Sequence, residues 1–314
     1  MALRITMHNS DPTSLFPAHE GISTDGNSTE KNRMSKHRRF LWFLLGCILI
    51  SIAPAPSAIA QITIRDAKRL PVFQLSGATS DPQALALALR ALAALWGNQV
   101  IHDVTLTGNV TWVSGNSETG TAALEALGTN ESRIDLALPD GTRTEIRDAS
   151  AGFAQGKWIN PDGKSGMFAA HNAMTDAVWF FPALGSLTGG PNIVLSYVGP
   201  ETRNGQSVQH LRSCHYQTPS PNTPDLTEQQ LSTMDFYLDA ASSLPVAVVF
   251  NQHPDDNARV NIPIEVDYSN YQPISGVLVP MHIQKSMNGA PLLDVTLTGV
   301  VFNSGLALSE FSVN

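Results

Sequence analysis

Apolar and polar residues alternate with a period of two along much of the chain beyond residue 100. Apolar side chains take every second position in four clear segments, which are 104–112, 134–138, 260–268 and 277–283. This period is typical of strands that bury one face and expose the other to water. The pair Asn288-Gly289 is a tight-turn signal between two such strands. The pattern therefore predicts an antiparallel sheet built largely of hairpins.

A helix is predicted ahead of the first strand, beginning at Asp81-Pro82. An Asp side chain can accept from the free N–H groups of a first turn, and proline at the next position lacks a donor that would be unpaired anyway. The apolar residues that recur at helical spacing and are expected to form the buried stripe are Leu85, Leu89, Leu92 and Trp96. Gly97 supplies the stop.

A second helix is predicted between Met167 and Leu184, where alternation is lost. Its expected apolar face consists of Met167, His171, Met174, Val178 and Phe181, and Pro182 helps to end it. The proline-rich stretch Gln217–Thr227 is predicted to be a stiff polar loop.

The order of these elements indicates the fold class. There is neither an alternation of strands with helices nor a repeat of fixed length, so a parallel sheet and a solenoid are both disfavoured. The expectation is a mainly β protein with two helices (α+β), in which one strongly curved antiparallel sheet carries the helices on its apolar side. The folded domain is expected to span 80–314.

The first sixty residues read as an export signal. Basic residues from Lys36 to Arg39 precede the apolar run Phe40–Ile52, and Ala58-Ile59-Ala60 places small residues at a cleavage site. The run is shorter than the roughly 20 residues of a membrane-spanning helix. We therefore expect a signal peptide over 34–60, a non-coding or disordered extension over 1–33, and an N-terminal extension of the mature chain over 61–79. The protein is expected to be exported, to the periplasm or beyond the cell, with no membrane span after cleavage.

Charge and cysteine content narrow the classes of partner. The chain has 19 Lys and Arg against 27 Asp and Glu, a net charge of -8, which disfavours a nucleic-acid partner held by its phosphates. Of two cysteines, one lies in the signal region, so Cys214 alone would remain and no internal disulfide is expected. Cys214 is interpreted as a small buried residue on a strand, with an exposed thiol that pairs between chains as the alternative.

Catalytic and metal-binding patterns are weak. His210 and His215 are five residues apart on a predicted strand, hence on opposite faces, and cannot meet on one metal. The stretch His253-Pro254-Asp255-Asp256 is more typical of a solvated turn than of a cation site. No nucleophile elbow, zinc-protease motif or phosphate loop is present. We therefore expect no enzyme, no metal and no cofactor.

The last third of the chain carries an ordered set of short motifs. A strand ends in Asp at Met234–Asp239, Leu244-Pro245 opens the next strand, Asp267-Tyr268 lies in a third, and Gly276–Pro280 begins a fourth. Phe302-Asn303 follows near the end. In this order the motifs resemble the closing strands of LolA/LolB-like proteins, the periplasmic lipoprotein carriers and their relatives.

The resemblance implies an incompletely closed antiparallel β-barrel whose concave side is apolar and is covered by helices acting as a lid. Such a cavity holds acyl chains by burial, since each methylene removed from water contributes about 0.8 kcal/mol. An arginine that ties the lid to the sheet is also implied, and Arg133 and Arg143 are candidates by position. The residues expected to line the cavity are Leu106, Val110, Trp112, Ile134, Leu136, Met174, Val178, Phe181, Phe236 and Val266.

Two functions follow from this sequence. The first is an exported binding protein that holds a lipid, a lipoprotein acyl chain or another hydrophobic ligand in a half-barrel cavity. The alternative is an exported structural or interaction module of the same fold, whose interior is filled by its own side chains.

Overall fold

A computed structural model describes residues 79–313, except 130, 151–152, 176–177, 183–186, 188–191 and 217–224. The expected signal peptide over 34–60, the extension over 1–33 and all of 61–79 but its last residue lie outside the described residues. In the part of the chain that is described, no helix has the length and apolar character needed to cross a membrane.

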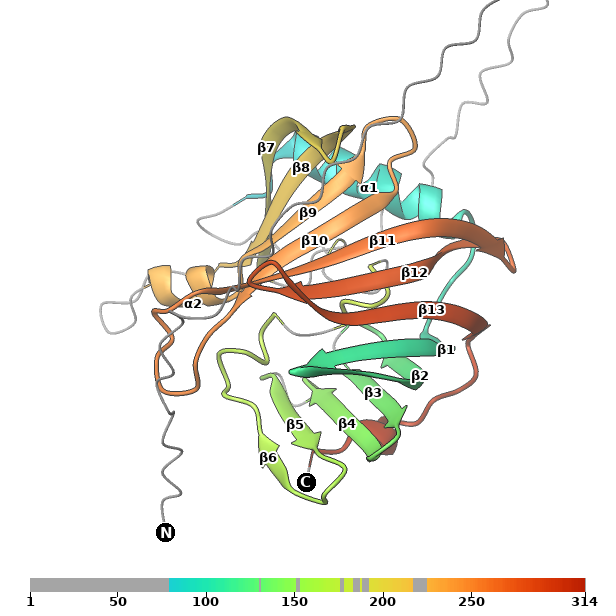
Figure 1. Ribbon diagram of the computed structural model, residues 1–314. Coiled ribbons are helices and arrows are strands. Elements are labelled where there is room, and N and C mark those ends of the chain that lie inside the picture. The colour runs from blue at the N-terminus through green and yellow to red at the C-terminus, as the bar shows by residue number, and fades with distance from the viewer. Residues whose placement is uncertain are drawn as a thin grey trace, which may run out of the picture. The chain divides into compact units, whose positions relative to one another are not determined.

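The described strands form one antiparallel sheet. Its strands are β1 (Asp103–Ser114), β2 (Asn116–Leu127), β3 (Glu131–Leu138), β4 (Gly141–Asp148), β5 (Gln155–Ile159), β6 (Ser165–Met167), β7 (Ile193–Arg203), β8 (Gln206–His215), β9 (Met234–Asp239), β10 (Pro245–Gln252), β11 (Ile262–Ile274), β12 (Val277–Met287) and β13 (Ala290–Phe302). Their spatial order is β6-β5-β4-β3-β2-β1-β13-β12-β11-β10-β9-β8-β7. Figure 1 shows the sheet as a curved surface. It is not closed, because β6 and β7 remain at its two edges.

Because β1, the first strand, lies in the middle of the sheet, the chain must cross the sheet once to supply strands on both sides of it. Strands β1 to β6 run outward to one edge, and β7 to β13 run back from the other edge until β13 pairs with β1. The connection from β6 to β7 therefore spans the sheet. We call its described residues 168–175 and 178–182 the crossing segment.

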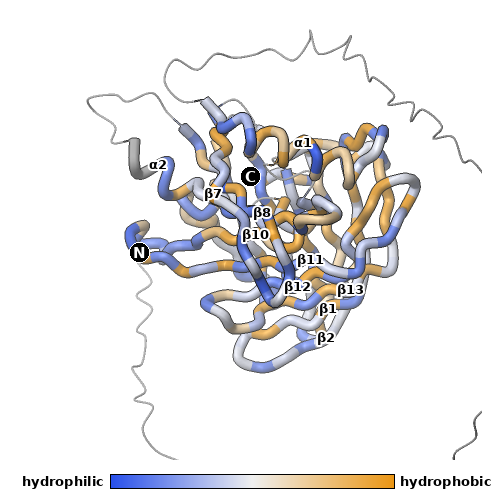
Figure 2. The backbone as a smooth tube through the Cα atoms, turned by 90° about the horizontal axis from the view of Figure 1, so that it is seen from above, coloured by the Kyte–Doolittle hydropathy of each residue, from blue (hydrophilic) through white to orange (hydrophobic). Residues whose placement is uncertain are grey.

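The sheet buries one face, here called the inner face. Val104, Leu106, Val266 and Val295 are fully buried on it. The alternation of hydrophobic and hydrophilic residues that creates this face is visible along the strands in Figure 2. Val178 and Phe181 of the crossing segment belong to the same core cluster as these strand residues, so the crossing segment packs on the inner face.

The first helix, α1 (Pro82–Trp96), begins and ends as predicted. The Asp81 side chain accepts from the N–H of Gln83 at 2.7 Å, and Gly97 follows the last turn. The predicted stripe is wrong in part, because Leu85 and Leu89 are 43% and 58% exposed. The buried face consists instead of Ala84, Leu87, Ala88, Ala91, Leu92 and Leu95. Because alanine side chains are small, this face approaches β7 and β12 closely. Close packing, rather than the size of the apolar side chains, therefore decides which face of α1 is buried.

The second predicted helix, over 167–184, is not formed in the described residues. Met167 ends β6, and the crossing segment consists of turns. The spacing of its apolar residues is compatible with a helix, but it is equally compatible with an irregular segment that inserts side chains into a core. The second helix of the fold is α2 (Asp225–Leu231), which contacts β8 and includes part of the stretch expected to be a loop. Two helices on a mainly β framework are thus confirmed, whereas a helical cover of the concave side is not.

Candidate functional site

A cavity of about 340 Å³ lies between the inner face and the crossing segment. Its apolar walls come from β1, β3, β12, β13 and the crossing segment, and they consist of Trp112, Ile134, Leu136, Met287, Leu292, Leu293, Phe168 and Trp179. Its polar lining consists of Ser114, Arg143, Glu145, Gln252 and Lys285. Because Ser114 is exposed at the end of β1, the cavity reaches the surface of the domain.

The register of the sheet explains why charged side chains enter this cavity. Arg143 of β4 lies directly opposite Leu136 of β3, and Glu145 lies opposite Ile134. Residues opposite one another in an antiparallel pair point to the same face, so β4 presents charged groups to the inner side. In the same way Lys285 lies opposite the buried Leu293.

Aromatic rings hold two of these cations. The Arg143 guanidinium carbon lies 5.0 Å from the centroid of the Trp112 ring, and Lys285 Nζ lies 4.6 Å from the centroid of the Trp179 ring. Lys285 is only 5% exposed. Cations over aromatic faces gain electrostatic stabilisation that grows as water is removed.

Main-chain and side-chain hydrogen bonds fix the crossing segment over the cavity. Arg147 of β4 donates from Nε to the carbonyl oxygen of Ala173 at 2.6 Å. At the opposite side, the buried Tyr268 hydroxyl of β11 donates to the carbonyl oxygen of Trp179. The segment is therefore attached to both halves of the sheet without being helical.

Neither of the two arginines expected by position, Arg133 and Arg143, makes the hydrogen bond from β4 to the crossing segment among the described residues. Arg133 pairs with Asp135, with Nε 2.6 Å from Oδ2, and it also donates to the main-chain carbonyl oxygen of Glu310. Arg143 stacks on Trp112. Arg147, which is 7% exposed, is the arginine that donates from the sheet to the described part of the crossing segment.

The predicted lining residues fall into two groups, with one residue outside both. Trp112, Ile134 and Leu136 line the cavity. The residues that lie instead within the packed core are Leu106, Val110, Val178, Phe181, Phe236 and Val266. Met174 is half-buried in the crossing segment and belongs to neither the core cluster nor the cavity wall. The cavity thus occupies one part of the inner side, and core packing fills the rest.

Sequence reasoning missed Phe168, Trp179, Lys285, Met287, Leu292 and Leu293 as lining residues, and it considered Arg143 only as a link to the lid. One signal was available, because the alternation of Val277, Val279, Met281 and Ile283 continues to position 285 and places Lys285 on the inner face. No local pattern marks Phe168 or Trp179, since the path of an irregular segment depends on the surface beneath it.

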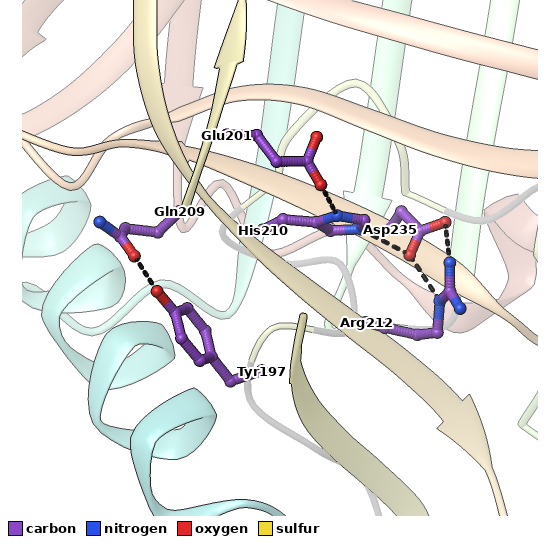
Figure 3. Close-up of polar contacts among 6 residues, drawn as sticks. All are labelled: Tyr197, Glu201, Gln209, His210, Arg212 and Asp235. Atoms are coloured by element: carbon purple, nitrogen blue, oxygen red, sulfur yellow. Dashed lines mark hydrogen bonds and ion pairs between the residues drawn. The ribbon is translucent and has the colours of Figure 1, made fainter. Parts of the chain in front are cut away.

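A second polar cluster lies on the outer face of β7, β8 and β9, as Figure 3 shows. His210 is held between two carboxylates, with Nδ1 2.5 Å from Glu201 and Nε2 2.8 Å from Asp235. Arg212 also donates to Asp235. Both ring nitrogens of His210 are thus within hydrogen-bond distance of carboxylate oxygens, and its side chain is 7% exposed.

The outer cluster continues onto β11. Arg203 lies over the Tyr237 ring, 4.3 Å from its centroid, and pairs with Glu265. Asp267, two residues further along β11, lies beside Glu265. Burial, followed by the charge and hydrogen bond of Glu265, raises the pKa of Asp267 to about 6.

The other residues that the sequence raised as candidates are His215, His253 and Cys214. His215 lies on the face opposite His210, as predicted, and burial lowers its pKa. His253 is buried, with Nδ1 3.0 Å from the carbonyl oxygen of Val260. Within the described residues, no group of three or more His, Cys, Asp or Glu side chains is placed to hold a metal ion. Cys214 is buried, which confirms the first of its two interpretations, and burial raises its pKa.

Comparison with known proteins bears on the fold. No family model matches the sequence, and no curated protein matches it. A domain from Vibrio parahaemolyticus that carries the name outer membrane lipoprotein-sorting protein superposes with a TM-score of 0.50 at 15% identity, over 73% of this chain and 96% of that one. A DUF1329 family protein from Desulfovibrio piger gives 0.49 at 10% identity, over 75% and 98%. A LolA superfamily protein from Nitrosomonas europaea gives 0.46 at 10% identity, over 73% and 97%.

At 15% identity, the likeness to the Vibrio parahaemolyticus domain shows a shared fold and does not extend to a ligand. That fold is an open, curved antiparallel sheet, as the closing-strand motifs of this chain implied. The resemblance is therefore confirmed at the level of architecture, since this chain shares its fold with the Vibrio parahaemolyticus outer membrane lipoprotein-sorting domain.

Proposed function

We propose that this chain is an exported binding protein that holds a lipid, a lipoprotein acyl chain or another hydrophobic ligand in the cavity beneath the crossing segment. The observation that carries the proposal is the cavity itself, about 340 Å³ of space walled by Trp112, Leu136, Trp179 and Leu293. This volume falls at the lower end of the range for small-molecule sites, roughly 300–1,000 Å³. The name of the Vibrio parahaemolyticus domain, lipoprotein sorting, agrees with such a role.

The affinity of such a site comes from burial. Each methylene that moves from water to the cavity contributes about 0.8 kcal/mol, so a chain of several methylenes binds without specific chemistry. No catalytic group is needed for this task, and we infer a binding protein rather than an enzyme. The basic and apolar pattern of residues 34–60 supports export, with the periplasm as the destination.

Native mass spectrometry of the processed protein, purified from an exporting bacterium, tests the proposal. We expect additional mass that organic solvent removes, and uptake of a fluorescent fatty acid by the stripped protein. A bare polypeptide that also fails to take up the fatty acid would favour the interaction module with a filled interior, which the packing of Val178 and Phe181 in the core would then explain.

A filling variant locates the site. Met287 is half-buried at the cavity wall, so Met287→Trp should reduce fatty-acid uptake by occupying the space. Leu308→Trp is the matched control, because Leu308 is 50% exposed on the short 3-10 helix Leu308–Phe311. Equal uptake by the two variants would place the ligand elsewhere.

A further inference from the structure

Trp112 and Arg143 stand between two hollows of different character. Both residues line the apolar cavity, and both line a second hollow of about 360 Å³. The second hollow is lined also by Glu118, Asp140 and Asp162. The Arg143 guanidinium is therefore within reach of a ligand in either hollow, where an apolar surface gives way to a polar one.

Arg143 has donors available for a ligand. Arg133, Arg203 and Arg212 each pair with a carboxylate. Within the described residues Arg143 pairs with no carboxylate, and its guanidinium stacks instead on the Trp112 ring. Stacking occupies a face of the guanidinium and leaves the N–H groups at its edge free to donate to an anion.

The carboxylates of the second hollow indicate that the ligand carries a positive group beyond its anionic group. Asp162 pairs with Lys164, with Oδ2 2.6 Å from Nζ. Glu118 and Asp140 have no ion-pair partner among the described residues. These two carboxylates would repel a ligand that carries only negative charge. A ligand with a positive group beyond its negative group would complement both the arginine and the carboxylates.

We propose that the cavity and the second hollow together bind a single-chain zwitterionic amphiphile, such as an alkyl phosphoethanolamine. The apolar tail lies against Leu136 and Leu293, the phosphate accepts from Arg143, and the ammonium group faces Glu118 and Asp140. This inference rests on the proposed function, and it names the class of ligand.

Three ligands with the same tail test the inference by calorimetry: dodecylphosphoethanolamine and dodecyl phosphate below their micelle concentrations, and dodecanol below its solubility limit. The zwitterion should bind about tenfold or more tighter than the alcohol, since a hydrogen bond to a charged partner is among the stronger ones. Its advantage over dodecyl phosphate should be smaller, about two- to fivefold, because exposed carboxylates act through water.

Variants test which protein group recognises each part of the ligand. Arg143→Gln should remove most of the advantage of the zwitterion over dodecanol while dodecanol affinity changes less than about twofold, and Arg143→Lys should restore part of it. Arg90→Gln, on the exposed side of α1, is the matched control. Glu118→Gln with Asp140→Asn should remove the preference for the zwitterion over dodecyl phosphate.

Two results would overturn the inference in distinguishable ways. Equal affinity for all three ligands, or equal weakening of all three by Arg143→Gln, would refute headgroup recognition and leave the hydrophobic carrier intact. Failure of all three to bind would refute both the headgroup and the proposed function.

Discussion

Asn172 and His253 hold one another through two reciprocal hydrogen bonds, although 81 residues separate them along the chain. The Asn172 side chain donates from Nδ2 to the carbonyl oxygen of His253 at 2.8 Å, and its Oδ1 accepts from the N–H of His253 at 2.8 Å. The amide thereby takes the place of a strand neighbour just beyond the end of β10. This contact anchors the crossing segment to the sheet.

Replacing Asn172 should loosen the crossing segment. Asn172→Ala leaves a buried N–H and a buried carbonyl without these partners, and we expect the free energy of unfolding to fall by about 1–3 kcal/mol. Urea denaturation measures the loss. Asn116→Ala, at the exposed start of β2, is the control and should change stability little. A loss no larger than that of the control would show that the reciprocal pair contributes nothing to stability.

Gly108 should tolerate no side chain. It lies at a register shift where β1 pairs with β13, and a Cβ added there would lie 2.3 Å from the carbonyl oxygen of Thr296. Since main-chain atoms must move to relieve this overlap, Gly108→Ala should destabilise the protein by about 1–3 kcal/mol.

The comparison is Asn109→Ala on the same strand, whose side chain is exposed. Thermal or urea unfolding of both variants checks the prediction. Equal stability of the two would mean that the β1–β13 pairing relaxes without penalty.

The carboxyl pair on β11 should make stability depend on pH. The pKa of Asp267 is raised to about 6 in the folded state, chiefly by burial and then by Glu265, so the folded protein binds this proton more tightly than the unfolded chain does. Its contribution to stability is therefore present at low pH and is lost as the pH rises through about 6.

Asp267→Asn removes the titration and keeps a donor toward Glu265. The variant should gain stability over the natural protein at pH 8 and differ little from it near pH 3, below the usual pKa of an aspartic acid, as urea unfolding at the two pH values would show. Asp255→Asn, in the exposed turn after His253, makes the same change of charge and should show no such dependence. A gain of the same size at both pH values would contradict the account.

The thiol of Cys214 should react slowly in the folded protein. Cys214 is 8% exposed, and burial raises its pKa, so little thiolate is available to a reagent. Labelling with iodoacetamide at pH 8 should be slow without urea and fast with it. Rapid labelling of the folded protein, or a disulfide-linked dimer on a non-reducing gel, would revive the interpretation as an exposed thiol.

Local patterns in the sequence determined most of the framework. Alternation with period two predicted the strands because each strand buries one face regardless of its neighbours. Asp81, Pro82 and Gly97 fixed the ends of α1, since capping depends on residues within one turn. Trp112, Ile134 and Leu136 were correctly expected on the inner face for the same reason.

Only the tertiary structure decided where the inner side stays hollow. Val178, Trp179 and Phe181 all belong to the core cluster, but Trp179 alone of the three also lines the cavity, and no spacing along the chain distinguishes these neighbours. Arg143 became a site residue because it lies opposite Leu136 and stacks on Trp112 of another strand. Periodicity reports which face of an element is buried, but what fills the space against that face depends on side chains brought from elsewhere in the chain.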